Sequence, residues 1–303
     1  MILCAGESLI DMVPVDGDFR PLPGGSVWNT ALALGRLGAP VAYFWPISRD
    51  GFGDALLRPL AEAGVNTARC PRSDLLTTLA FVTLTAGEAR YSFYDEGSAG
   101  RMLSEDELPE LDDSISALFI GGISLVPEPC GSAIEALAFR AAEAGIPIVV
   151  DPNIRPFFIT DPDAHRARLD RLMSVATVVK MSADDFDWLY PDHSVEAAAD
   201  RILGRGPTLV LRTGGAQGAV AHTAAGQLTA PAIRVQVADT IGAGDTFNAG
   251  VLDALHRSGG LARMDRLDQQ TLASALAHAA RAAAVTVSRP GADPPWRHEV
   301  DAA

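Results

Sequence analysis

The chain has 303 residues, and its 24 basic and 38 acidic side chains give a formal net charge of −14. With 48% hydrophobic residues it can bury a large core, which excludes an intrinsically disordered chain. The acidic balance offers no basic surface for a nucleic acid or an anionic membrane. We therefore expect neither of them as a partner.

The three cysteines lie far apart and in no paired motif, which predicts neither a disulfide framework nor a zinc site. The N-terminus lacks the basic region of a secretory signal and already carries Glu7 and Asp11, and no apolar run is long enough to cross a bilayer. These features favour a reducing, cytoplasmic location.

Short apolar, β-branched runs alternate along the chain with amphipathic stretches of helical period. We predict strands at residues 2–5, 41–45, 117–121, 147–151, 177–180 and 208–212. We predict helices at residues 27–37, 53–63, 130–144, 164–173 and 194–203. Buried strands that alternate with helices form parallel sheets covered on both faces. The sequence thus predicts an α/β fold, a three-layer sandwich with a central, mostly parallel sheet.

Two segments interrupt this alternation. Residues 11–23 fall outside it, and residues 79–94 read as two alternating strands joined by a turn at Ala86-Gly87-Glu88. Alternation leaves one face exposed, so we predict a small antiparallel sheet that acts as a lid. An edge hairpin with no part in closure fits the pattern equally well. The whole chain, 1–303, is then one domain with lid segments at about 11–23 and 66–100, and a loop is expected after Pro290.

The strongest local motif is Asp-Thr-Ile-Gly-Ala-Gly-Asp-Thr-Phe at residues 239–247, ahead of a helical pattern at 248–256. Its small residues let the backbone turn tightly and leave the first helical amides free for an anion. Asp245 could then take a proton from a hydroxyl while the helix end stabilises a transferring phosphoryl group. The same pattern is also typical of an ordinary helix N-terminus.

A second motif, Pro-Gly-Gly-Ser-Val-Trp-Asn at residues 23–29, opens the helix predicted at 27–37. The paired glycines let the backbone approach a ligand, and the amide of Asn29 can both donate to and accept from a sugar hydroxyl. Simple capping of the helix by Ser26 is the alternative.

Several common sites are absent from the sequence. The single lysine, Lys180, lies outside any P-loop motif, and no dinucleotide-binding glycine motif follows the first strand. The histidines show no metal-binding spacing, and no hydrolase Gly-x-Ser-x-Gly is present. A P-loop phosphate cradle is therefore excluded, and the fingerprint of a dinucleotide-binding dehydrogenase is absent.

With both motifs considered, the sequence resembles the ribokinase-like (PfkB) family of carbohydrate kinases from Ile2 to about Pro294. Residues 239–247 match the C-terminal signature of the family, and residues 24–38 match its N-terminal signature. The resemblance implies that Asp245 is the catalytic base and that the anion hole is formed by Gly242, Ala243 and Gly244. It also implies a lid and a set of sugar-binding residues, namely Asp11, Gly24, Gly25 and Asn29.

The resemblance places ATP against the turn that carries Thr213, Gly215 and Gly218, with further contacts expected from Ser182, Gly242 and Gly244. Many members have Asn-x-x-Glu where this chain has residues 182–185, so the resemblance implies magnesium with Asp185 as its candidate ligand. Ser182 and Asp185 equally fit a cap of their own helix. A potassium site would involve Asp239 and the carbonyl of Ile241, and since Pro295 replaces a hydroxyl residue of some relatives, the potassium requirement is open.

The substrate is predicted from two segments. Residues 151–155, Asp-Pro-Asn-Ile-Arg, resemble a segment shared by fructokinases and 2-keto-3-deoxygluconate kinases, where Arg155 could meet the transferring phosphate or an acidic substrate. Kinases of keto-deoxy sugar acids often carry Arg where this chain has Asp95, which would repel an acidic substrate. The chain looks most similar to bacterial fructokinases, which implies that D-fructose is converted to fructose 6-phosphate.

Phe93 would pack on the sugar from the lid, or alternatively serve as one inward residue of a hairpin. The alternatives for function are 2-keto-3-deoxygluconate kinase, ribokinase, tagatose kinase and a non-catalytic sugar-binding protein. A homodimer formed through the exposed lid strands is a further expectation.

Overall fold

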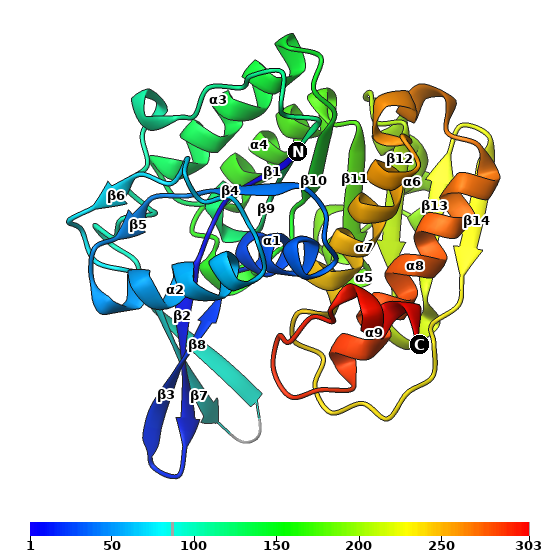
Figure 1. Cartoon of the computed structure of the whole chain (residues 1–303). Coiled ribbons are helices and arrows are strands. Elements are labelled where there is room, and N and C mark those ends of the chain that lie inside the picture. The colour runs from blue at the N-terminus through cyan, green and yellow to red at the C-terminus, as the bar shows by residue number, and fades with distance from the viewer. Residues whose placement is uncertain (86–87, 303) are drawn as a thin grey trace.

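The computed structural model describes residues 1–85 and 88–302. A central eight-stranded sheet has the order β14-β13-β12-β11-β10-β9-β1-β4 (Figure 1). Its parallel part contains all six predicted strands, which are therefore confirmed: β1 (Ile2–Ala5), β4 (Val41–Phe44), β9 (Ala117–Gly121), β10 (Ile148–Asp151), β11 (Val178–Ser182) and β12 (Leu209–Thr213). The antiparallel strands β13 (Ala219–Thr223) and β14 (Gly226–Ala230) extend one edge.

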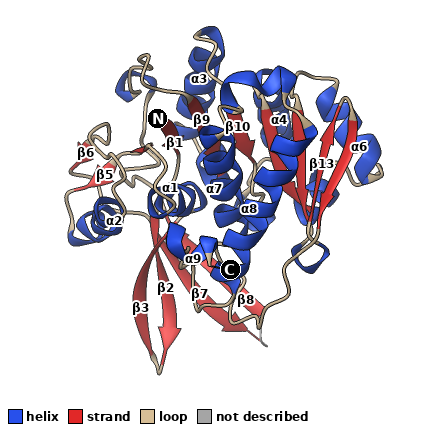
Figure 2. Ribbon diagram, turned by 45° about the vertical axis from the view of Figure 1, so that its right-hand side comes forward, coloured by secondary structure: helices blue, strands red, loops and turns tan. Residues whose placement is uncertain are grey.

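Helices cover both faces of this sheet, which confirms the three-layer sandwich (Figure 2). One layer contains α1 (Ser26–Arg36), α7 (Ala243–Arg257) and α8 (Gln269–Val287). The other contains α3 (Cys130–Glu143), α4 (Pro162–Val175) and α6 (Val195–Leu203). Every residue of β1, β4, β9 and β10 is buried, because apolar side chains point into both layers.

Shorter elements complete the structure. The helix α2 (Gly51–Glu62) packs on α1, while α5 (Ala183–Leu189) follows β11 directly. Strands β5 (Ile47–Ser48) and β6 (Arg72–Ser73) form a two-stranded sheet, and the 3₁₀ turns are η1 (Glu105–Glu107), η2 (Gly122–Leu125), η3 (Pro156–Phe158), η4 (Gly215–Gln217) and η5 (Leu261–Arg266). None of the helices in the described ranges is long and apolar enough to cross a membrane.

The sequence prediction missed several elements, among them α8 and the pair β13 and β14. Much of the buried face of α8 is alanine, so its apolar periodicity is weak in the sequence. The loop expected after Pro290 is wrong in part, because it contains the helix α9 (Arg297–Asp301). The carboxylate of Glu299 accepts a hydrogen bond from the Trp296 amide and starts this helix.

The small sheet has the strand order β3-β2-β7-β8 and projects from the body (Figure 1). It consists of two antiparallel hairpins, β2 (Leu9–Val15) with β3 (Asp18–Gly24) and β7 (Leu79–Thr85) with β8 (Glu88–Tyr94). The hairpins are joined by parallel pairing between β2 and β7. Residues 86 and 87 of the expected turn lie outside the described residues.

The pairing register decides which side chains share a face of the small sheet. Asp11 pairs with Ala80, which in turn pairs with Phe93, so Asp11 and Phe93 lie on one face. Phe19, Phe81 and Tyr94 form edge-to-face ring contacts on the opposite face. Residues 66–78 of the expected lid segment lie outside this sheet, where Asn66 and Arg72 pair with Ala42 and Ile47 of the body.

A buried carboxylate connects α7 to the two helices that follow it. Asp253, which is fully buried, accepts hydrogen bonds from Arg257 Nε at 3.1 Å and from Arg297 Nη2 at 2.9 Å. His278 Nε2 of α8 lies 3.0 Å from the same carboxylate. Since these partners come from α7, α8 and α9, Asp253 holds the C-terminal half of α7 in place.

We expect Asp253→Ala to lower the free energy of unfolding by about 3 kcal/mol, because its cationic partners lose a buried counter-charge. Urea denaturation at pH 7 measures this change. Arg257→Ala is the matched control: its side chain is 50% exposed, so a loss of less than about 1 kcal/mol is expected. Equal losses in the two variants would contradict this role of Asp253.

Candidate active site

Asp245 lies in the first turn of α7, where that helix meets the carboxyl end of the parallel sheet. Asn29 of α1 donates its Nδ2 to Asp245 Oδ2 at 2.8 Å, and Thr30 Oγ1 donates to the Asp245 carbonyl at 3.3 Å. Asn153, in the loop after β10, places its Nδ2 3.5 Å from Asp245 Oδ1. The structure therefore brings together two sequence motifs that lie 216 residues apart.

The N-terminus of α7 presents free backbone amides. Gly242 caps the helix in the left-handed region with φ of 76°, and a Cβ at this position would lie 2.8 Å from the Cβ of Ala292. The amide of Ala243 donates to the Thr240 carbonyl at 3.3 Å. The amides of Gly244 and Asp245 find no acceptor within the described residues. The first turn thus offers donors to an anion, but Ala243 is a weaker contributor than the sequence predicts.

The environment of Asp245 suits a general base. The carboxyl is 6% exposed, and burial raises its pKa to about 7, although the hydrogen bond from Asn29 acts in the opposite direction. Nearby Asp151 also raises the pKa, whereas Lys180 and Arg155 lower it. A carboxyl with a pKa near the working pH can accept a proton from a hydroxyl and release it again.

The predicted sugar-binding residues gather where β2, β3 and α1 meet. Gly25 has φ of 111°, and a Cβ there would come within 2.5 Å of the Glu7 carbonyl. Gly24 lies against Asp11, since a Cβ on it would come within 2.5 Å of Asp11 Oδ2. Burial raises the pKa of the Asp11 carboxyl to about 6. Asn29, which donates to Asp245, follows these residues in the first turn of α1.

The alternative that Ser26 caps α1 is wrong. The helix has Gly25 at its N-cap, and the Ser26 hydroxyl has no hydrogen-bond partner in the part of the chain described. Instead, the buried side chain of Glu7 accepts from the Ser26 amide at 2.9 Å and from the Ser124 amide at 3.2 Å. Glu7 therefore fixes the start of α1, a role that the sequence analysis missed.

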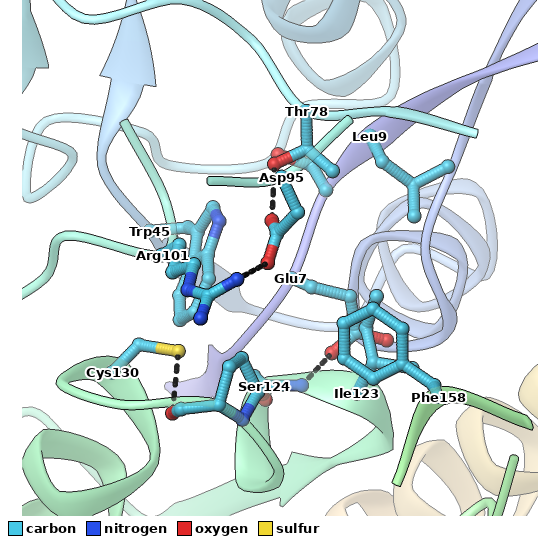
Figure 3. Close-up of a pocket in the computed structure, with 12 residues that line it drawn as sticks. Glu7, Leu9, Trp45, Thr78, Asp95, Arg101, Ile123, Ser124, Cys130 and Phe158 are labelled. Carbon is cyan, nitrogen blue, oxygen red and sulfur yellow. Dashed lines mark hydrogen bonds and ion pairs between the residues drawn. The ribbon is translucent and has the colours of Figure 1, made fainter. Parts of the chain in front are cut away.

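A small cavity of about 10 Å³ lies beside Glu7 and Ser124 and is also lined by Asp95 and Arg101, among others (Figure 3). Such a volume holds one water molecule at most. Asp95 accepts from Thr78 at 3.0 Å, and its second oxygen lies 3.5 Å from Arg101 Nη1. Because its charge is paired, Asp95 repels an acidic substrate less than the sequence argument assumes.

Phe93 belongs to an aromatic cluster between the small sheet and the loop after β10. Its ring lies 4.8 Å from Phe158, edge to face, and 6.2 Å from Phe157, nearly parallel. Tyr91 stacks on Phe157 at 5.4 Å. Arg155, just before η3, is exposed and donates to the carbonyls of its own loop. The cluster therefore connects β8 to the segment that carries Asn153 and Arg155.

The predicted nucleotide turn follows β12. Thr213 ends that strand and pairs with Ser182, the last residue of β11. The turn closes through the Gly214 amide, which donates to the Gly218 carbonyl at 2.8 Å, and Gly215 begins η4 within it. The turn and Ser182 thus lie at the same edge of the sheet as the N-terminus of α7.

Asp185 is engaged by protein donors. Its Oδ1 accepts from the Ile154 amide at 2.7 Å, and its Oδ2 accepts from both the amide and the hydroxyl of Ser182 at 2.7 Å. This arrangement is a capping box for α5. The ranges 1–85 and 88–302 contain no group of three or more His, Cys, Asp or Glu that could hold a metal. The residues present thus do not fit a protein-bound magnesium.

Asp239 organises the loop before α7. Its Oδ1 accepts from the Ile241 amide at 3.1 Å, and its Oδ2 accepts from the Gly291 amide at 2.9 Å. The amide of Ala238 donates to the Val287 carbonyl at 2.8 Å. The loops before α7 and after α8 are thereby joined.

Three residues near Asp245 were not predicted to matter, namely the buried Lys180 and Asn248 and the partly buried Asn153. Lys180 of β11 donates to Asp151 Oδ2 at 2.9 Å, and Asn248 of α7 donates to the same oxygen at 2.7 Å. The sequence contained one indication of these roles, because Lys180 lies within an otherwise apolar stretch of β11. Asn153, with φ of 43°, is held by its amide on Asp151 Oδ1 at 3.1 Å.

Comparison with known proteins identifies the class. The model of the pfkB family carbohydrate kinases matches residues 1–299, and the chain belongs to this family. A fructokinase from Rhizobium leguminosarum bv. trifolii is 46% identical over 281 residues, which cover 90% of this chain and 85% of that protein.

Two solved structures share the fold. A fructokinase from Xylella fastidiosa with bound ATP superposes with a TM-score of 0.90 at 30% identity, covering 99% of this chain and 97% of the other. A fructokinase double mutant from Vibrio cholerae O395, in a form with bound fructose, ADP and potassium ion, superposes with a TM-score of 0.86 at 25% identity. The match covers 96% of this chain and 93% of the other. The protein is therefore a carbohydrate kinase, as the sequence motifs predicted.

For this enzyme we expect kcat/KM to fall about tenfold per pH unit below a midpoint near pH 7, because only ionised Asp245 can accept the proton.

Asp245→Asn should abolish turnover and raise the Tm at pH 8 by a few degrees. Folding raises this pKa from 3.8, so the buried carboxylate destabilises the folded state at high pH.

The gain in Tm should disappear below about pH 4, where the carboxyl is protonated in both the folded and the unfolded chain. Differential scanning fluorimetry of both proteins across this range measures the effect. A stability difference that does not change with pH would contradict the burial argument.

Proposed function

We propose that the protein transfers the γ-phosphoryl group of ATP to the 6-hydroxyl of D-fructose. The observation that carries the proposal is the pair of Asp245, a buried carboxylate whose pKa is raised to about 7, and the free amides that begin its helix. A base and an anion site then lie side by side, which in-line phosphoryl transfer requires. The fructokinases among its relatives support fructose as the acceptor.

In this reaction Asp245 accepts the proton of the sugar hydroxyl while the hydroxyl oxygen forms a bond to the γ-phosphorus of ATP. The bond between that phosphorus and the bridging oxygen breaks, and ADP leaves with the electron pair. The amides of Gly244 and Asp245, with Gly242, stabilise the charge on the transferring group. Arg155 supplies a further positive charge from the loop after β10.

The sugar is proposed to lie between Asp245 and the small sheet. Asp11, Asn29 and the backbone at Gly24 and Gly25 would then contact its hydroxyls, with Phe93 packing above. The small sheet serves as the lid, which excludes the water that would otherwise accept the phosphoryl group.

ATP is proposed to bind along the turn of Thr213, Gly215 and Gly218 beside Ser182. The ATP bound by the Xylella fructokinase supports ATP as the nucleotide. Magnesium would arrive on its phosphates as part of the substrate. Potassium is proposed to bind at the loop of Asp239 and Ile241. The potassium ion bound by the Vibrio fructokinase supports the use of this cation.

We also propose that residues 1–303 form one domain that works as a homodimer in the cytoplasm. The outer face of the small sheet supports a dimer, because Phe19 and Tyr94 on it are 44% and 66% exposed. The free thiols of Cys4, Cys70 and Cys130 support a reducing compartment. Other sugars of the family, 2-keto-3-deoxygluconate, ribose and tagatose, remain alternative acceptors.

The test measures ADP release from ATP and magnesium with fructose, ribose, tagatose, 2-keto-3-deoxygluconate or no sugar. We expect release with fructose, and a loss of at least about a thousandfold in Asp245→Ala, since proton abstraction and the carboxylate are both removed. Sugar binding without ADP release would support the non-catalytic alternative, and turnover with another sugar alone would replace fructose.

Potassium dependence has a separate test. Replacing 100 mM sodium with potassium, a concentration of about physiological strength, should raise kcat several-fold in the wild type. Asp239→Asn should lose this response, because its neutral amide would no longer attract a cation to the loop. Equal activity in both salts would reject the proposed potassium site.

A further inference from the structure

The strongest feature that the proposed reaction leaves unused is the only lysine of the chain. Lys180 is 3% exposed, in the middle of β11, which is covered on both faces. Burying an ammonium group in an apolar sheet is unfavourable unless a counter-charge and hydrogen bonds accompany it. Its partner is Asp151, 1% exposed, at 2.9 Å.

This ion pair is joined to the helix that carries Asp245. Asn248 lies one turn after the start of α7 and donates to the same Asp151 oxygen at 2.7 Å. The other Asp151 oxygen holds the amide of Asn153, whose side chain reaches Asp245. Asp151 therefore connects β10, β11 and α7 at the point where the reaction takes place.

The ammonium group also lies directly against the anion site. A Cβ on Gly244 would come within 3.1 Å of Lys180 Nζ, so the lysine touches the residue that provides one of the two free amides. A glycine at this position allows that approach. The positive charge therefore lies against the first turn of α7.

We propose that Lys180, held by Asp151 and Asn248, is a positioning residue that keeps a fixed positive charge beneath the first turn of α7. There it stabilises both the Asp245 carboxylate and the charge on the transferring phosphoryl group. The inference rests on the kinase function proposed above and deepens it. Preorganised charges of this kind act strongly where water is excluded.

The other charges around Asp245 do not replace this one. From β10 and its loop come Asp151, which raises the Asp245 pKa, and Arg155, which lowers it. Helix α1 contributes the neutral side chains Asn29 and Thr30. Asp185 of α5 acts on Lys180 and, together with Asp151, raises the lysine pKa although burial opposes this, so the ammonium stays charged.

The test compares Lys180→Met, Lys180→Arg and the double variant Lys180→Met/Asp151→Asn, in ADP release with fructose between pH 6 and 9. In Lys180→Met we expect kcat to fall at least about tenfold with little change in KM for fructose. The fall of kcat/KM at low pH, here called the acid limb, should move to higher pH by about half a unit. The reason is that Asp245 loses a nearby cation but keeps Asp151. Lys180→Arg, which keeps the charge, should restore the limb.

The double variant separates this role from a purely structural one. It contains no unpaired buried charge, so its Tm should recover and its acid limb should return toward that of the wild type. Its kcat should stay low, since the positive charge beneath the anion site is still missing. A double variant that recovers both Tm and kcat overturns the proposal, and it decides the question even where Lys180→Met alone does not fold.

Arg168→Met is the matched control. Arg168 is also a buried cation, paired with Glu128 and Glu135, but it lies on α4. We expect its Tm to fall while the pH profile stays unchanged. A folded Lys180→Met enzyme with kcat within about twofold of the wild type and an unmoved limb would reject the proposal. Absence of wild-type turnover with every sugar would instead reject the proposed function.

The position of the limb has an additional readout that needs no turnover. The difference in Tm between Asp245 and Asp245→Asn proteins, followed against pH, reports the ionisation of Asp245. This difference is measured in the wild-type background and again in the Lys180→Met background. The pH at which it appears should be higher in the Lys180→Met background. An identical pH dependence in both backgrounds counts against the proposed charge effect.

Discussion

The placement of a helix N-terminus against the carboxyl end of a parallel sheet governs the rest of this structure. The first turn of α7 presents unpaired amides, and such groups are costly to bury unless a ligand or water satisfies them. Asp245 lies in that turn and is buried with one strong hydrogen bond, from Asn29. The fold thus concentrates a carboxylate and unpaired donors at one point, an arrangement that stability alone does not favour.

The surrounding polar network explains how the fold tolerates this arrangement. The Asp151 carboxylate accepts hydrogen bonds from Lys180, Asn153 and Asn248. The Asp185 carboxylate accepts hydrogen bonds from Ile154 and Ser182, so donors surround both of these buried groups. Far from the sheet edge, Asp253 anchors the other end of α7 to α8 and α9. Helix α7 is therefore held at both ends, as a preorganised site requires.

The small sheet has a different character from the body. One of its faces carries Asp11 and Phe93 toward the site, while the opposite face exposes Phe19 and Tyr94. The contacts of Phe93 with Phe157 and Phe158 bring it onto the loop that also holds Asn153. Phe93 therefore connects β8 to the loop whose Asn153 reaches Asp245.

The sequence by itself determined the six parallel strands and the two glycine-rich helix starts. These features depend on local apolar patterns and on backbone freedom that few residue types provide. It could not assign α8, whose buried face is largely alanine, nor the cap of α1 by Glu7, which acts across 19 residues. Ser182 and Asp185 stand where many relatives have a magnesium motif and also fit a capping box, and the contacts of both Asp185 oxygens show the capping box.

Only the tertiary structure decided the electrostatics of the site. The raised pKa of Asp245 depends on burial between α1 and the sheet, and the paired charge of Asp95 depends on Arg101 across a loop. Lys180 reads in the sequence as an isolated charge in an apolar strand, and its partners come from β10 and α7. Sequence motifs encode which groups are present, whereas distances and desolvation, which set their energies, exist only once distant segments have packed together.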